Sequence, residues 1–147
     1  MNNSEIIVQS QTDDQKLEIA LNFLSALRIG EWNLLRSIIT EDCEWTLPGT
    51  SMISGDVIGA DAIIERARII VGFEVTLQLN HILYGQYDVV LSIHTQASRD
   101  GFQLNEFLAM VCLLKEAKIA AINTHLSNVL GVNAFFTEEN LHSNVPL

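Results

Sequence analysis

The sequence has few basic residues, few cysteines and prolines, and no long hydrophobic run. Its 147 residues include 8 lysines and arginines against 18 aspartates and glutamates, which gives a formal net charge of −10. Nucleic acid and anionic membrane surfaces both select basic partners, so we expect neither as a partner. No segment approaches the ~20 consecutive apolar residues of a membrane span. Because 48% of the residues are nevertheless hydrophobic, we expect an internal cavity or a subunit interface.

The two cysteines indicate a reducing compartment. Cys43 and Cys112 lie inside apolar strand-like runs, where a free cysteine is typically buried as a small hydrophobic residue. The first residues, MNNSEIIVQSQTDD, have neither the basic segment nor the long apolar segment of a secretion signal. We therefore expect a cytoplasmic protein.

The length fits one domain. We expect a flexible N-terminal arm over residues 1–14, a single domain over 15–131 and a C-terminal tail over 132–147. Apolar residues spaced by three and four predict helices over residues 15–29, 31–39 and 60–70. A short strand is expected over Cys43–Leu47, where the pattern alternates and stops at Pro48-Gly49.

Four strand-like runs then follow one another between Phe73 and Leu126. They read FEVTLQLNHIL, DVVLSIHTQAS, FQLNEFLAMVCLL and KIAAINTHL, and their short breaks predict antiparallel hairpins. If Arg99-Asp100-Gly101 is a three-residue loop, Ser98 faces Phe102. In that register the inner face of the sheet carries no carboxylate, and His94 and Glu106 lie opposite each other on the outer face.

Both faces of the last two runs are largely apolar, whereas a sheet with one solvated side alternates cleanly. Three helices can cover one face, and nothing else in the chain obviously covers the other. A second copy of the protein, in an isologous contact, is the economical explanation. We therefore expect a homodimer formed through the outer face of the sheet.

Several local motifs strengthen one family resemblance. They are Glu44-Trp45-Thr46-Leu47-Pro48-Gly49, Gly59-Ala60-Asp61-Ala62-Ile63, Asn105-Glu106-Phe107 and Lys118-Ile119. In this order, the chain from roughly Lys16 to Asn128 resembles the SnoaL-like polyketide cyclases, which are related to ketosteroid isomerase within the NTF2-like superfamily. The resemblance implies a cone-shaped α+β (cystatin-like) fold, with three N-terminal helices packed on a curved, mostly antiparallel sheet. It also implies a deep, mostly apolar pocket between helices and sheet.

The resemblance does not carry over the family's catalytic groups. The position of the isomerase base is Leu47 here, and the position of its second acid is Ala109. The aspartate that cyclases often have near the end of the last strand is replaced by Ser127, and the tyrosine before it by His125. Because a fold licenses no reaction by itself, the sequence leaves open whether the protein is an enzyme.

The four histidines are the remaining candidates for chemistry. His81, His94, His125 and His142 form no His-x-x-x-His pair and have no cysteine cluster nearby, so we expect no metal and no cofactor. His81 shares the parity of Val75, Leu77, Leu79 and Leu83. It is either a buried core residue or a catalytic base, with Asn105 or Trp45 as the hydrogen-bond donor to the substrate oxygen.

Two main hypotheses follow. The first is a protein that binds a small hydrophobic molecule in its pocket, and the second is a cofactor-free isomerase or cyclase that uses His81 as its base. A scaffold with a vestigial pocket is a third. The residues expected to line the pocket are Phe23, Leu27, Trp45, Leu47, His81, Ile93, Asn105, Phe107, Ala109, Ile122 and Thr124.

Overall fold

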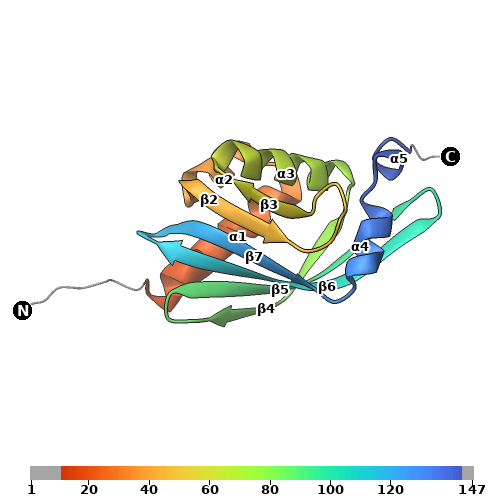
Figure 1. Ribbon diagram of the computed structural model, residues 1–147. Coiled ribbons are helices and arrows are strands. Elements are labelled where there is room, and N and C mark those ends of the chain that lie inside the picture. Colours follow the sequence, from red (N-terminus) through yellow and green to blue (C-terminus); the bar gives the residue numbers. More distant parts are fainter. Residues whose placement is uncertain (1–10, 144–147) are drawn as a thin grey trace, which may run out of the picture.

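A single six-stranded sheet organises the computed structural model, which describes residues 11–143 (Figure 1). The strand order is β3-β2-β7-β6-β5-β4. The only parallel pair in this sheet joins β2 to β7, and the other pairs are antiparallel. The strands are β2 (Ile39–Leu47), β3 (Gly55–Ile58), β4 (Thr76–Tyr84), β5 (Asp88–Arg99), β6 (Phe102–Lys115) and β7 (Lys118–Leu126).

Three helices in the N-terminal half cover one face of the sheet, as Figure 1 shows, and the predicted α+β class is confirmed. They are α1 (Asp13–Ile29), α2 (Trp32–Ile38) and α3 (Ala60–Gly72). The helix α1 begins two residues earlier than expected, because Thr12 and Gln15 form a reciprocal capping box. It ends at Gly30, whose φ of 72° is the left-handed conformation typical of a helix C-terminus.

The C-terminal segment is helical rather than a plain tail. Helices α4 (Val129–Phe135) and α5 (Glu138–Leu141) lie across one end of the sheet (Figure 1). The first of them begins inside the range expected for the domain. Residues 1–10 of the expected arm and 144–147 of the expected tail lie outside the described part of the chain.

The hairpin between β5 and β6 corrects the predicted register. Arg99 pairs with Phe102, so the loop contains only Asp100 and Gly101. Their φ angles are 48° and 85°, as in the type I′ turn that two-residue hairpins and Asp-Gly sequences favour. The three-residue loop expected from the sequence is therefore wrong. A shift of one residue moves every β6 side chain to the opposite face of the sheet.

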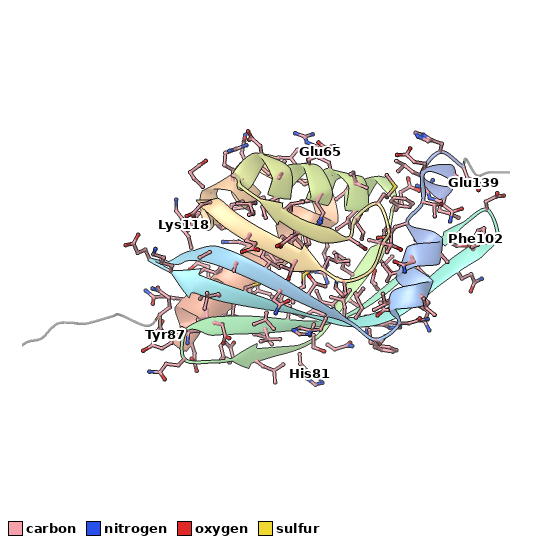
Figure 2. The ribbon with its side chains drawn as sticks, viewed as in Figure 1. Glu65, His81, Tyr87, Phe102, Lys118 and Glu139 are labelled. Carbon is pink, nitrogen blue, oxygen red and sulfur yellow. The ribbon has the colours of Figure 1, made fainter. Side chains whose placement is uncertain are left out.

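The strand β4 contains an irregularity that the sequence did not reveal. Its register against β5 shifts between Leu79 and His81, which pair with Ile93 and Ser92 respectively. Because of this bulge, Leu79 packs against the core while His81 is exposed on the outer face. Figure 2 shows His81 projecting away from the helices. The shared parity on which the catalytic role of His81 rested is therefore broken.

The core fills the space between the inner face of the sheet and the helices. Trp45 is fully buried there, with the Phe23 ring edge-on at 6.3 Å. Cys43 and Cys112 are both free and buried, as expected, and burial raises the pKa of the Cys43 thiol to about 12. Within residues 11–143, no helix has both the length and the hydropathy that a membrane span needs.

The register of β5 and β6 depends on a turn that glycine adopts without strain. Gly101→Ala places no atom within 4 Å of another residue, so its cost is purely conformational. We expect it to lower the free energy of unfolding by roughly 1–2 kcal/mol, measured by urea denaturation. The matched control is Gly72→Ala in α3, where the added Cβ meets Leu141 at an ordinary 3.6 Å. Equal effects of the two substitutions would contradict the turn assignment.

Candidate functional site

A largely enclosed cavity lies between the helices and the inner face of the sheet. Its volume is about 40 Å³. Since a cavity needs about 10–15 Å³ to hold one water, this one has room for roughly three waters. Its wall is apolar except for Thr95, Glu106 and Thr124. An apolar cavity with a few polar groups is typical of sites that bind small molecules.

Glu106 is the one charged side chain in the described wall of this cavity. It lies on β6 and is only 1% exposed. Its Oε2 accepts hydrogen bonds from the Ser127 hydroxyl and the Asn128 amide, each at 2.9 Å, and from the Ser127 amide. Within residues 11–143, no donor bonds to its Oε1. The surface that the cavity presents is nevertheless apolar, so Glu106 contributes its hydrocarbon part to the wall rather than an open oxygen.

The donors to Glu106 explain how the chain tolerates a buried carboxylate. Burying a charge is costly unless hydrogen bonds or an opposite charge compensate it. None of the ion pairs in residues 11–143 involves Glu106, so its compensation comes from the neutral donors of Ser127 and Asn128. These donors precede α4 directly, which links the carboxylate to the C-terminal helices.

Thr124 supplies a second polar group. Its Oγ1 accepts a hydrogen bond of 2.8 Å from the indole Nε1 of Trp45. Arg66 fixes the indole in turn, because it donates to the Trp45 carbonyl at 3.1 Å and its guanidinium lies 5.4 Å from the ring centre. The Thr124 hydroxyl thus holds the indole from the side of β7.

Thr95, on β5, is less available. It pairs directly with Glu106 across the strands, and its hydroxyl donates to the Thr76 carbonyl at 2.8 Å. Thr95 can therefore only accept a further hydrogen bond. The polar groups of Thr95, Glu106 and Thr124 are thus bonded within the protein, and the cavity presents apolar surface to its contents.

Residues 128–143, which we call the C-terminal cap, close one side of the cavity. Val132 and Phe136 contribute to the wall. The Asn133 side chain accepts a hydrogen bond of 2.7 Å from the Thr50 amide, and the Phe136 carbonyl accepts one of 3.2 Å from the Met52 amide. These contacts hold the cap against the loop after β2.

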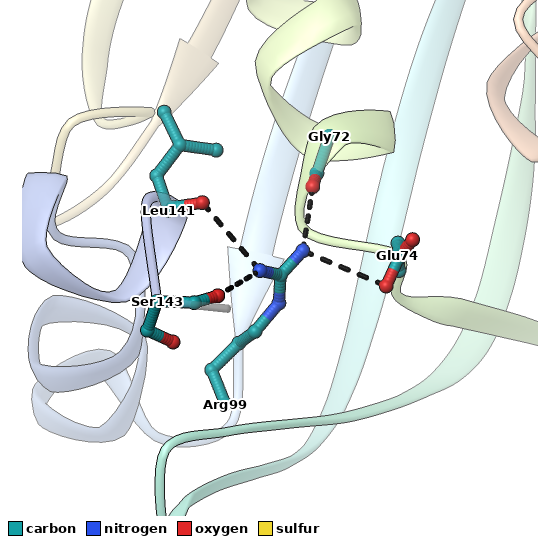
Figure 3. A network of polar contacts seen from close by, with 5 residues as sticks. All are labelled: Gly72, Glu74, Arg99, Leu141 and Ser143. Atoms are coloured by element: carbon teal, nitrogen blue, oxygen red, sulfur yellow. Dashed lines mark hydrogen bonds and ion pairs between the residues drawn. The ribbon is translucent and has the colours of Figure 1, made fainter. Parts of the chain in front are cut away.

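Arg99 anchors the far end of the cap (Figure 3). Its guanidinium donates to the Ser143 carbonyl at 2.9 Å and to the Gly72 carbonyl at 2.7 Å. It also lies 3.7 Å from the Glu74 carboxylate. One side chain next to the β5–β6 turn therefore joins the cap to the end of α3.

The structure divides the residues that the sequence assigned to the pocket. Leu27, Leu47 and Thr124 line the cavity. Four others are buried in the core but do not line it. These are Phe23, Trp45, Ile93 and Ile122.

The remaining four assignments are wrong, because these residues lie on the outer face. His81 is there because of the β4 bulge, and Asn105, Phe107 and Ala109 because of the one-residue register shift. Neither catalytic candidate, His81 or Asn105, reaches the cavity.

The expected pairing of His94 with Glu106 is also wrong, because Thr95 pairs with Glu106. His94 instead stacks on Phe107 with ring centres 4.3 Å apart, and its Nε2 lies 2.5 Å from Asn105 Oδ1. The expectation of a cavity without a carboxylate fails for the same reason, since Glu106 points inward. Reading Asp100-Gly101 as a two-residue turn would have placed Glu106 correctly.

Within the described residues, no group of three or more His, Cys, Asp or Glu side chains is placed to hold a metal ion.

Comparison with known proteins identifies the fold. No protein-family model matches the chain, and no curated protein sequence matches it. Among solved structures, Bal32a from a soil-derived mobile gene cassette is 23% identical over 84% of this chain and 97% of that chain, with a TM-score of 0.78. Other matches are described as NTF2-like or as having a cystatin-like fold. The predicted NTF2-like fold is confirmed.

Two further matches with this fold have names that refer to chemistry. A protein described as a SnoaL-like polyketide cyclase, from Jannaschia sp., is 14% identical over 88% of this chain and 98% of that chain, with a TM-score of 0.70. TerC, co-crystallised with polyporic acid, is 17% identical over 88% of this chain and 99% of that chain, with a TM-score of 0.69. At such identities the likeness establishes the fold alone.

The donors around Glu106 generate a stability prediction. Glu106→Leu leaves the Ser127 and Asn128 donors without their acceptor, whereas Glu106→Gln keeps an oxygen for them. We expect the leucine variant to be less stable than the glutamine variant by about 1–3 kcal/mol, measured by urea denaturation. Glu65→Leu and Glu65→Gln, on the exposed side of α3, are the matched controls and should differ little. A leucine variant as stable as the glutamine variant would show that these hydrogen bonds contribute nothing net.

Proposed function

We propose that the protein binds a small, apolar molecule in the cavity. One observation carries this proposal: the largely enclosed cavity between the helices and the sheet presents only apolar surface, to which Leu27, Leu108 and Met110 contribute. A ligand with an apolar surface that enters this space is removed from contact with water, which is favourable.

The size of the cavity implies that a ligand displaces part of its wall. About 40 Å³ is room for water but not for an organic ring. Val132 and Phe136 reach the cavity from the C-terminal cap, whose Phe135 and Phe136 rings pack against Phe73, so a ligand would have to displace side chains of this packed segment. That a protein with this fold, TerC, has been co-crystallised with polyporic acid is consistent with small-molecule binding.

A second candidate function is proton transfer on such a molecule, as in a cofactor-free isomerase or cyclase. The observation that favours it is that Glu106 and Thr124, which carry a carboxyl and a hydroxyl group, both line one cavity. In this form Glu106 replaces His81 as the base, and Thr124 donates to the substrate oxygen. Exchange of ligand C–H for deuterium in D₂O, followed by NMR and lost in Glu106→Gln, separates this function from simple binding.

Binding itself is tested with a neutral fluorescent probe, N-phenyl-1-naphthylamine. We expect saturable binding with energy transfer from Trp45. Leu108→Phe enlarges a side chain in the cavity wall and should weaken binding at least about fivefold, a loss of roughly 1 kcal/mol. Leu113→Phe makes the same change on the outer face, where Leu113 is 46% exposed, and should leave binding unchanged. Equal affinities of the two variants would argue against the cavity as the site.

We also propose that a second copy of the chain covers the outer face. From Val90 to Ser98 and from Gln103 to Leu113, the outward positions of β5 and β6 carry no aspartate, glutamate, lysine or arginine. Phe107, at the centre of this face, is 53% exposed. For copies with a net charge of −10, a face without aspartate, glutamate, lysine or arginine is where two can meet with the least repulsion.

The homodimer is tested by analytical ultracentrifugation. Phe107→Glu places a charge opposite its own copy and should convert the dimer to a monomer, because a buried unpaired charge is costly. Phe102→Glu is the matched control, since Phe102 is 48% exposed but lies at the hairpin tip (Figure 2). A monomeric wild-type protein at micromolar concentration would remove this proposal. The absence of nucleic-acid and membrane partners and the cytoplasmic location stay predictions from charge and composition.

A further inference from the structure

The strand β4 forms a free edge of the sheet. Within residues 11–143, β5 is the only strand that pairs with it. An unpaired edge strand presents a row of backbone N–H and C=O groups to which a further strand can add. We propose that residues 6–8 of the same chain, which precede the described part, add to this edge beside residues 82–84. The contact is separate from the cavity and does not depend on what the cavity binds.

The open backbone groups of β4 follow from its pairing with β5. The Gly85 amide donates to the Asp88 carbonyl at 3.0 Å next to the turn. Bonded and non-bonded pairs alternate along an antiparallel ladder, and the β4 bulge lies farther along the strand. Counting back from Gly85, Leu83 is therefore bonded to β5. The N–H and C=O groups of Ile82 and Tyr84 face the free edge.

The other half of the β4 edge is less available. Arg28, in the last turn of α1, donates two hydrogen bonds to the Leu77 carbonyl, at 2.6 and 3.0 Å. The bulge between Leu79 and His81 then interrupts the regular backbone, and bulges are among the features that protect edge strands from pairing. The edge can therefore accept only a short strand, next to the β4–β5 turn.

The chain enters α1 beside this same turn (Figure 1). Lys16, in the first turn of α1, donates to the Gly85 carbonyl and to the Gln86 carbonyl, the latter at 3.0 Å. Three residues separate Val8 from the helix cap at Thr12, and three extended residues span about 10 Å. This reach is roughly two strand spacings of 4.8 Å. A strand that ends at Val8 can therefore lie beside the turn end of β4 and run parallel to it.

Apolar side chains surround the open part of the edge. Leu21 lies seven residues before Arg28, so both are on the side of α1 that reaches β4. It is 44% exposed, and Leu83 and Tyr84 on β4 are 54% and 43% exposed. Residues 6–8 read Ile-Ile-Val, and β-branched residues favour strands. Because their side chains alternate in direction, an added strand covers apolar surface on both sides of the edge.

Amide hydrogen exchange, followed residue by residue with ¹⁵N NMR, tests the pairing. In a chain that lacks residues 2–9, we expect the amides of Ile82 and Tyr84 to exchange at least about tenfold faster than in the full chain, because they lose their hydrogen-bond acceptors. The Leu83 amide, which is bonded to β5, is the internal reference and should change by less than about threefold.

Substitutions that keep the length of the chain provide a second comparison. Ile6→Ser combined with Val8→Ser removes apolar contacts and should accelerate exchange at Ile82 and Tyr84 as the deletion does. Asn2→Ser combined with Asn3→Ser, outside the pairing segment, is the matched control and should have no effect. The substituted chain decides the matter should the shortened one fail to fold.

Two results would overturn the proposal. One is equal exchange of the Ile82 and Tyr84 amides in the full, shortened and substituted chains, which would show that residues 6–8 do not reach the edge. The other is protection of these amides that falls on dilution of the full chain. Pairing within one chain is independent of concentration, whereas pairing with a second copy is not, so this result would assign the added strand to another molecule.

Discussion

The two-residue turn Asp100–Gly101 is the constraint on which the sheet and its site depend. Because β5 and β6 are the longest strands and pair along their whole length, the turn fixes which face each β6 residue occupies. It places Glu106 inside, next to Thr95, and Phe107 outside. A loop one residue longer would exchange these two residues. The inward carboxyl group of Glu106 and the exposed ring of Phe107 are thus two results of one local conformation.

The carboxylate of Glu106 belongs to two parts of the structure at once. It projects from β6 into the cavity, and its Oε2 receives the amides of Ser127 and Asn128, where the chain leaves the sheet and enters α4. A residue that lines the cavity therefore also holds the base of the segment that closes it. Any movement of the cap that begins at Asn128 changes the hydrogen bonding of Glu106, so the cap and the cavity wall are physically coupled.

The sequence predicted the three N-terminal helices and the run of hairpins from β4 to β7 well because their signals are local, but it did not predict β3, α4 or α5. The capping residues of α1 and the spacing of its apolar residues suffice to place it, and the family motifs indicated the fold. The face of each strand was harder to predict. Both faces of β6 carry apolar residues, for instance Leu108 inside and Phe107 outside. The alternation of apolar and polar residues therefore did not show which side chains of β6 point inward. The bulge before His81 has no signature in the sequence. The site was therefore predicted only where residues came from β2, β7 and α1.

The turns at Asp100–Gly101 and Glu116–Ala117 differ in how many contacts tie them to the rest of the fold. The Asp100–Gly101 turn adjoins Arg99, which donates hydrogen bonds to the carbonyls of Gly72 and Ser143. This hairpin is therefore tied both to the end of α3 and to the C-terminal cap. The turn at Glu116–Ala117 has the same left-handed backbone, with φ of 54° and 66°, and both of its residues are exposed. New chain ends, an affinity peptide or a fused reporter would accordingly be accommodated at Glu116–Ala117, at the end of β6 away from Glu106. The same insertion at Asp100–Gly101 would change the register of β6 and the faces of its side chains.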